Sequence, residues 1–195
     1  MFMLKLFVGL LLLYFCCCDL DPLEKQALDE LYNETDGINW TTSTNWMTGD
    51  PCNDSWHGVT CLSDSVISLL LPGNNLQGSL PDLYLPSVTS IDLSGNQLTG
   101  ILPNWNFPSL VHMFLHNNDL TGNMPNWNMP SLRTMHLYSN QLTGNLPNWN
   151  MPSLITMRLE INDLNGNLPN WNMPDLTEMQ LYNNELTGNI PNWNM

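Results

Sequence analysis

The side chains best suited to chemistry lie in the central part of this 195-residue sequence. Three of the four histidines and both arginines fall between residues 112 and 158, among aromatic and acidic side chains. Such a mixture can form hydrogen bonds to a peptide or a sugar and can stack on it. The candidate ligand-binding residues are His112, Phe114, His116, Arg133, His136, Tyr138, Arg158, Glu160, Glu178, Gln180 and Tyr182.

A repeat of 22 residues carries these side chains. Its six copies start at Val66, Val88, Leu110, Leu132, Leu154 and Leu176. Each copy follows the pattern L-x-x-L-x-L-x-x-N-x-L, with other apolar residues at some leucine places, which is typical of a leucine-rich repeat solenoid. In the third copy Met113 and Leu115 are two residues apart, so both face the core from an extended strand. The alternate residues His112, Phe114 and His116 then face outward.

The rest of the repeat closes one coil. Asn118 can turn inward and satisfy backbone groups, Leu120 returns to the core, and Gly122 permits a tight bend. One coil cannot bury its apolar side alone, so neighbouring coils must stack. The predicted fold is a leucine-rich repeat solenoid, a right-handed coil with a parallel β-sheet on the concave face and an N-terminal helical, disulfide-clamped cap.

A tryptophan recurs in five copies of the repeat. In the first copy its place is taken by Leu83, and the apolar residue two places later is Leu85. Leucine as the substitute favours core fillers over an exposed aromatic ladder. The tryptophans are Trp105, Trp127, Trp149, Trp171 and Trp193.

The outward strand positions differ between copies that are otherwise nearly identical. This contrast favours a ligand-binding surface on the concave face. The alternative is drift, because the outside of a strand tolerates many residue types.

A different hypothesis places function on ladders of small polar groups that step by about one strand spacing, about 4.8 Å. Such ladders could order water or ice, or dock on crystalline polysaccharide. They lack that role if their side chains bond to the backbones of neighbouring coils. One ladder comprises Thr99, Thr121, Thr143 and Thr187, and the other Asn104, Asn126, Asn148, Asn170 and Asn192.

Catalysis has little support. The sequence contains no G-x-S-x-G, no H-E-x-x-H, no phosphate loop and no spaced cysteine-histidine set. His116 and Glu160 would be the best base and partner, but exposed side chains about 9 to 10 Å apart are not preorganised. His136 lies about 7 to 8 Å from His112 and His116, which are about 13 Å apart, so one ion bridges a pair at most. We predict no catalytic residue, no metal, no cofactor and no enzyme.

Residues 1–18 predict a secretory signal peptide cleaved near Cys18. Lys5 precedes an apolar run that is too short for the about 20 residues of a membrane span. An uncleaved anchor is the alternative. After cleavage Cys52 and Cys61 remain as one pair, and in an oxidising compartment they are expected to form a disulfide.

Residues 19–64 are expected to cover the open end of the solenoid. A helix begins there with Asp21 as N-cap, Pro22 at the first position and Glu24 in the place of a capping-box acid. We expect Gly37 to end it. Its apolar stripe is Leu23, Ala27, Leu28 and Leu31. Three glycosylation acceptors lie in the same segment, at Asn33, Asn39 and Asn53.

The chain is strongly acidic. It has 18 acidic residues and a formal net charge of −14, and all the acids follow position 18. Nucleic acids and anionic membranes both require a basic surface, so neither is an expected partner.

Several motifs resemble those of plant-type extracellular leucine-rich repeat proteins. The cap segment Trp56-His57-Gly58-Val59-Thr60-Cys61 is similar to that family's N-terminal cap, and residues 140–147 are similar to its N-x-L-x-G-x-I-P consensus. The family includes receptor-kinase ectodomains, polygalacturonase inhibitors and some ice-binding proteins. This sequence departs from it in having 22-residue repeats instead of about 24, no kinase domain and no C-terminal cap.

The resemblance and the residues together predict a secreted recognition module. Its expected organisation is a signal peptide at 1–18, a cap at 19–64 and six repeats at 65–195. The expected partner is an extracellular protein, peptide or glycan, and no stable membrane span follows signal cleavage. The alternatives are an ice- or polysaccharide-binding surface and an ectodomain fragment of a receptor-like protein.

Overall fold

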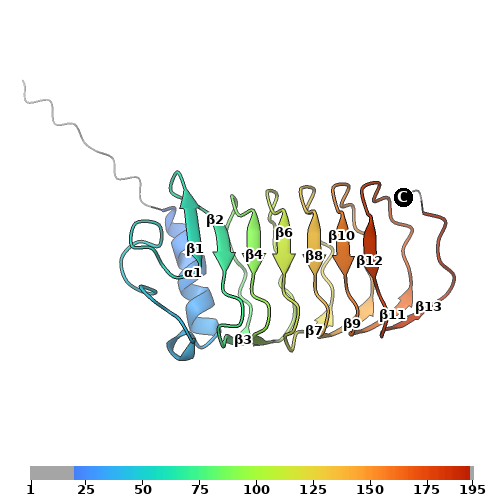
Figure 1. Ribbon diagram of the computed structural model, residues 1–195, viewed down its shortest axis with the longest axis horizontal. Helices are drawn as coiled ribbons and strands as arrows, with labels where there is room; N and C mark the ends of the chain where they lie inside the picture. Colours follow the sequence, from blue (N-terminus) through green and yellow to red (C-terminus); the bar gives the residue numbers. More distant parts are fainter. Residues whose placement is uncertain (1–19, 194–195) are drawn as a thin grey trace, which may run out of the picture.

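The computed structural model describes residues 20–193, and the signal-peptide prediction lies outside this range. Figure 1 shows coils stacked along one axis behind an N-terminal cap. The cap contains helix α1 (Pro22–Glu34), the 3-10 helix η1 (Gly37–Asn39) and strand β1 (Val59–Leu62). The predicted leucine-rich repeat solenoid is confirmed.

One parallel sheet runs along the solenoid. Its members after β1 are β2 (Ser65–Leu70), β4 (Ser90–Asp92), β6 (His112–Phe114), β8 (Thr134–His136), β10 (Thr156–Arg158) and β12 (Glu178–Gln180). Only β1 is antiparallel to its neighbour. Residues one repeat apart pair directly, as Met113 does with Met135. We call the outward surface of this sheet the strand face.

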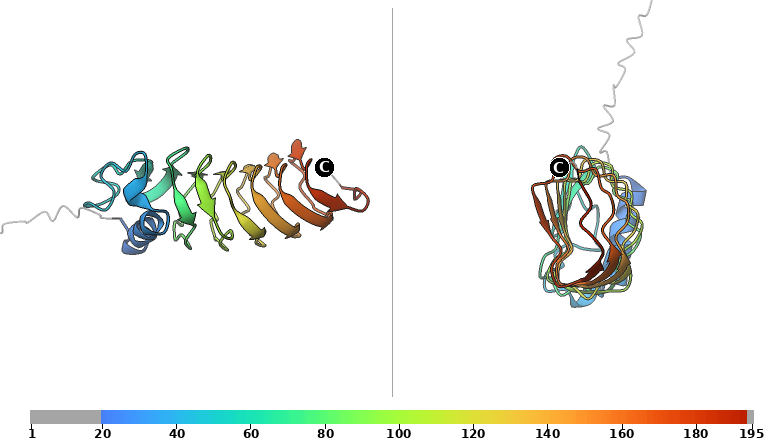
Figure 2. Two further views of the ribbon diagram at one scale, coloured as in Figure 1. Left: turned by 90° about the horizontal axis from the view of Figure 1, so that it is seen from below. Right: turned by 90° about the vertical axis from the view of Figure 1, so that its right-hand side faces the viewer.

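Two further short sheets lie on a different side of the coils (Figure 2). The first contains β3 (Gln77–Ser79) and β5 (Gln97–Thr99), and the second contains β7 (Thr121–Asn123), β9 (Gln141–Asn145), β11 (Asp163–Asn167) and β13 (Glu185–Thr187). A single bridge from Ile101 to Thr121 connects the two. The segments that follow these strands, with the sequence Pro-Asn-Trp-Asn in most copies, form what we call the return face.

The core is formed by the apolar columns of the repeat. Met113, Leu115 and Leu120 are fully buried. Asn118 turns inward as predicted: its Nδ2 donates to the carbonyl oxygens of Leu93 at 3.0 Å and Leu115 at 3.1 Å. Its Oδ1 accepts from the backbone N–H of Leu98, in the preceding coil, at 3.0 Å. Each asparagine of this column therefore joins two coils.

The tryptophans fill the core, which confirms the structural interpretation. Trp105, Trp127, Trp149 and Trp171 are buried, and Trp193 is half-buried. Each indole N–H donates to the carbonyl oxygen of a proline in the preceding coil, at 2.9 to 3.0 Å. A buried indole N–H needs an acceptor, and the proline carbonyl supplies it. Tryptophan therefore fits this core position by its hydrogen bond as well as by its size.

The start of α1 follows the prediction only in part. The Asp21 side chain caps the helix by accepting from the Leu23 N–H at 2.9 Å. The expected capping-box role of Glu24 is wrong, because this buried carboxylate accepts from the Val66 N–H at 2.8 Å and so ties the helix to the first repeat. Burial raises the pKa of Glu24, and the bond from Val66 opposes that change.

Two further helix predictions are wrong. Leu23 is 53% exposed, so the buried stripe consists of Glu24, Ala27, Leu28 and Leu31. The helix ends at Glu34 with Thr35 as C-cap, not at Gly37. The Thr35 hydroxyl donates to the Leu31 carbonyl at 2.6 Å, and this bond satisfies one of the last helical carbonyls before the glycine is reached.

The remainder of the cap is an aromatic cluster clamped by the predicted disulfide. Cys52 and Cys61 are bonded, with their Cα atoms 5.5 Å apart. Trp40, Trp46 and Trp56 are buried, and the ring of Trp46 packs against those of both Trp40 and Trp56, with centroids 4.8 and 4.9 Å apart. None of the helices within residues 20–193 is long and apolar enough to cross a membrane.

Candidate functional site

Six of the predicted ligand-binding residues form one contiguous group on the strand face. Three of them stand side by side in register on β6, β8 and β10, and three follow two residues later in each coil. On each of these strands a methionine lies between two outward residues and points into the core, because successive side chains of a strand face opposite sides. The group, called the strand-face cluster below, comprises Phe114, His116, His136, Tyr138, Arg158 and Glu160.

Ring contacts join the cluster across three coils. His116 stacks on Tyr138 with ring centroids 4.4 Å apart and an interplanar angle of 20°. Phe114 meets the edge of His136 at 5.1 Å. The Arg158 guanidinium lies 4.2 Å from the centroid of Tyr138 in a cation–π contact. The stacked rings form a semi-rigid aromatic surface, which is the kind of anchor found at binding hot spots.

Glu160 is fully buried, which corrects the expectation of an exposed acid facing His116. Arg158 donates to its Oε1 from Nε at 3.0 Å and also from Nη2. Its Oε2 is buried without a hydrogen-bond partner among the described residues, as are His116 Nδ1 and His136 Nε2. A buried polar atom without a partner is costly, and a small number of them at one place indicates a site where another molecule or water completes the bonding.

The two histidines of the cluster are held in their neutral form near neutral pH. Burial is the main cause and lowers the pKa of both His116 and His136. The Arg158 guanidinium lowers both further, while the carboxylates around them act in the opposite direction. At neutral pH the cluster therefore presents uncharged imidazoles that can each donate and accept a hydrogen bond.

These pKa shifts predict that acid destabilises the fold. In the unfolded chain both histidines titrate near about 6.5, so on acidification the unfolded state binds protons first. We expect the free energy of unfolding to fall as pH decreases from about 7 through the lowered folded values. Each histidine changes the free energy of unfolding by less than about 1.4 kcal/mol per pH unit, which is the slope for the uptake of one full proton. Urea unfolding at several pH values measures this effect, and the variant His116→Gln, His136→Gln should lose it.

The remaining predicted residues border the cluster or lie apart from it. His112 is exposed, with its ring 6.1 Å from that of Phe114. Gln180 donates to Glu178 at 2.8 Å on β12. Tyr182 is exposed one coil beyond Glu160. Arg133 is exposed and lies one residue before β8, outside the outward rows of the strand.

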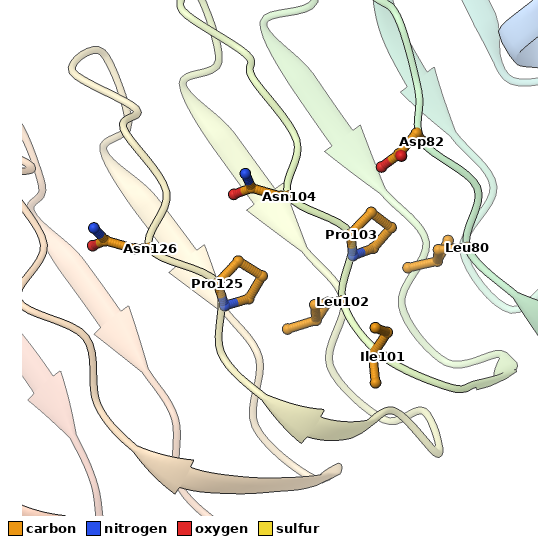
Figure 3. Close-up of a pocket in the computed structure, with 8 residues that line it drawn as sticks. All are labelled: Leu80, Asp82, Ile101, Leu102, Pro103, Asn104, Pro125 and Asn126. Atoms are coloured by element: carbon orange, nitrogen blue, oxygen red, sulfur yellow. The ribbon is translucent and has the colours of Figure 1, made fainter.

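The structure also contains a groove on the return face that the sequence analysis missed. It has a volume of about 810 Å³ and lies between the first three coils (Figure 3). Its lining residues are Leu80, Asp82, Ile101, Leu102, Pro103, Asn104, Pro125 and Asn126. One signal was available in the sequence: Asp82 and Ile101 stand where the later copies have asparagine.

Comparison with known proteins agrees with the leucine-rich repeat fold. The Leucine Rich Repeat family matches residues 87–107 and 131–151. A probable leucine-rich repeat receptor-like protein kinase of Arabidopsis thaliana is 42% identical over 62 residues, which are 31% of this chain and 6% of that protein. The BIR2 ectodomain of the same plant aligns over 87% of this chain and 96% of its own, at 28% identity and a TM-score of 0.69. The chain therefore has the repeat and the fold of a leucine-rich repeat protein and is similar to plant receptor ectodomains of this kind.

A second solved structure adds a ligand to the comparison. The ectodomain of the Arabidopsis receptor kinase HAESA, in complex with an extended IDA peptide hormone, is 25% identical with a TM-score of 0.70. The alignment covers 84% of this leucine-rich repeat protein and 29% of the HAESA chain. The likeness therefore extends over nearly the whole of the present solenoid but over less than a third of that receptor ectodomain.

The three glycosylation acceptors of this leucine-rich repeat protein are all exposed: Asn33, Asn39 and Asn53. Thr35 of the first sequon is buried, with its hydroxyl bonded to Leu31. The Asn39 amide donates to Asp36 at 2.9 and 3.1 Å. Glycosylation at these positions stays a prediction.

The absence of a bound metal also stays a prediction. Within residues 20–193, no group of three or more histidines, cysteines or acids is placed to hold a metal ion.

Proposed function

We propose that this leucine-rich repeat protein is a secreted, non-catalytic recognition module that binds an extracellular peptide or protein segment on its strand face. The observation that carries the proposal is the convergence of the variable outward residues into one cluster. Rings, a guanidinium and three unpartnered buried polar atoms meet there across only three coils. Elsewhere on the coils the repeat is nearly invariant.

The chemistry of the cluster supports a peptide ligand. Tyr138 and Arg158 are residue types enriched at binding hot spots, and the contact between them fixes both side chains before a ligand arrives. The neutral His116 and His136 supply donors and acceptors for a peptide backbone. The peptide complex of the related HAESA ectodomain supports the same class of ligand. A glycan, which also uses stacking and hydrogen bonds, is the alternative ligand.

Binding to an array of extracellular peptides and glycans tests the proposal. The variant Tyr138→Ala, Arg158→Ala should bind its selected ligand at least about 30-fold more weakly than the wild type, because each truncation removes a hot-spot contact. The matched control is Asn148→Ala, Asn170→Ala, which changes two exposed side chains of the return face and should bind normally. Equal binding by wild type and the strand-face variant would exclude this site.

A second candidate function is favoured by the asparagine ladder of the return face. Asn104, Asn126, Asn148 and Asn170 are exposed, and none of their amides forms a hydrogen bond within the described part of the chain. The threonine ladder differs, since the hydroxyls of Thr99 and Thr121 donate to backbone carbonyls of the preceding coil at 3.2 Å. Free amides at coil spacing support docking on ice or crystalline polysaccharide. Loss of such docking in Asn148→Ala, Asn170→Ala, with strand-face binding intact, would establish this function.

A further inference from the structure

The groove on the return face continues toward the cap. A smaller hollow of about 150 Å³ lies between α1 and the first return segment. Its lining residues are Leu23, Gln26, Ala27, Glu30, Asp82 and Tyr84. Asp82 lines both hollows, so they adjoin at this residue. Together they form what we call the cap groove.

The residues that shape the cap groove are departures from the repeat. Asp82 occupies the place of Asn104 and its equivalents, and Tyr84 occupies the place that later copies give to another asparagine. Ile101 replaces a third asparagine, which is present in all four later copies. Because coils with asparagine at all three places fold in the same chain, the fold does not require these substitutions.

Two of the substitutions, Tyr84 and Ile101, expose apolar surface, and an exposed leucine of α1 lies beside the same groove. Ile101 is 66% exposed, Leu23 53% and Tyr84 49%. Leaving large apolar side chains in water forgoes the free energy that their burial would contribute. Three such residues around one groove indicate a surface that another molecule covers. Elsewhere on this face the same positions carry asparagine, which needs no cover.

The charge of the cap groove selects its occupant. Two carboxylates, those of Asp82 and Glu30, line it, and neither hollow is lined by a lysine or an arginine. The whole chain has a formal net charge of −14, which repels an acidic partner. The partner that complements this groove is therefore basic as well as apolar.

We propose that the cap groove docks a peptide segment of another protein that carries an apolar side chain next to a lysine or arginine. The apolar side chain packs against Ile101 and Pro103, and the cation pairs with Asp82. Figure 3 shows the Asp82 carboxylate at one end of the groove, with Asn104 and Asn126 following along it. Their amides, which form no hydrogen bond within residues 20–193, supply hydrogen bonds to the backbone of an extended segment.

Restoring the repeat tests this proposal with little risk to the fold. The variant Asp82→Asn, Tyr84→Asn, Ile101→Asn places in the first two coils the residues that later coils already carry. A phage-displayed library of short random peptides is selected on the wild-type protein. We expect enrichment of sequences with lysine or arginine beside leucine, isoleucine or phenylalanine. A synthetic copy should bind the restored variant at least about tenfold more weakly and should bind Tyr138→Ala, Arg158→Ala as it binds the wild type.

Four outcomes would overturn the proposal. Selection of acidic peptides, or of peptides that bind the restored variant as well as the wild type, would remove the cap groove as a basic-peptide site. Failure to select any peptide has the same meaning. Concentration-dependent dimerisation of the wild type that is absent in the restored variant would assign the groove to a second copy of this chain. Because the strand-face variant leaves the cap groove untouched, either site can fail without the other.

Discussion

Replacing Asn140 with alanine should lower the free energy of unfolding by about 2 to 4 kcal/mol. The side chain is buried, and its Oδ1 accepts from the Leu120 N–H at 3.1 Å. Its Nδ2 donates to the carbonyls of Leu115 at 3.1 Å and Leu137 at 3.0 Å. Each of these carbonyls has a second asparagine donor, from Asn118 or Asn162, so the variant leaves them partly satisfied.

The Leu120 N–H has no such reserve, because Asn140 supplies its side-chain acceptor. An unpaired N–H in a dry interior costs about 1 to 3 kcal/mol, and the lost bonds to carbonyls add to this. Urea unfolding followed by circular dichroism measures the change. Asn148→Ala is the matched control, since this exposed asparagine makes no hydrogen bond within the described residues and should change stability by less than about 0.5 kcal/mol. Equal losses in the two variants would contradict the argument.

The repeat pattern predicts the core because stacking leaves little freedom. Once one coil is closed, every equivalent position meets its own counterpart one repeat away. Met113, Leu115 and Leu120 are therefore buried as expected, and Asn118 bonds to the backbone as expected. The cap does not repeat, so its details depend on single contacts. Glu24 shows this: its role depends on the distant Val66 N–H, not on the local helix signal.

The sequence predicts which side of the sheet the side chains of the candidate site face, but not how deeply each one is buried. Alternation along a strand places Arg158 and Glu160 on the same outward side, two residues apart. Whether such a side chain is exposed depends on what covers it. Arg158 folds onto Glu160 and at the same time onto Tyr138 of the neighbouring coil, and the carboxylate is left fully buried. The spacing of these residues allowed that pair, but the cation–π contact that holds it depends on the packing of two coils.

The second sheets were not predicted, and the reason is physical. Their strands contain glycines such as Gly144 at φ 75°, and glycine weakens a strand taken alone. A Cβ atom at Gly144 would lie 2.2 Å from Asn123 Oδ1 of the preceding coil, so the glycine serves coil packing. These strands form because stacking brings them into register. Ile101, which lines the cap groove, lies where the two short sheets are joined only by an isolated bridge.

Replacing Trp127 with alanine should have the largest effect on stability, a loss of about 3 to 5 kcal/mol. The indole is only 2% exposed, and its N–H donates to the Pro103 carbonyl at 3.0 Å. Alanine removes the ring and leaves a cavity between two coils that cannot collapse without shifting their neighbours. Because Trp127 belongs to a central coil, the loss weakens the interfaces on both sides. Thermal unfolding monitored by circular dichroism measures the change.

Trp127→Leu separates the two parts of this contribution. The first coil already holds Leu83 at the equivalent place, buried to 6% exposure, so the column accommodates leucine. Leucine keeps much of the apolar packing but cannot donate to Pro103. Its cost should therefore be well below that of alanine, by about 2 kcal/mol, with the remainder reflecting the lost hydrogen bond and residual volume. If leucine is as harmful as alanine, the hydrogen bond of the indole N–H contributes more than the packing of the ring. The bond from tryptophan to the proline carbonyl is then the main connection between coils on the return face.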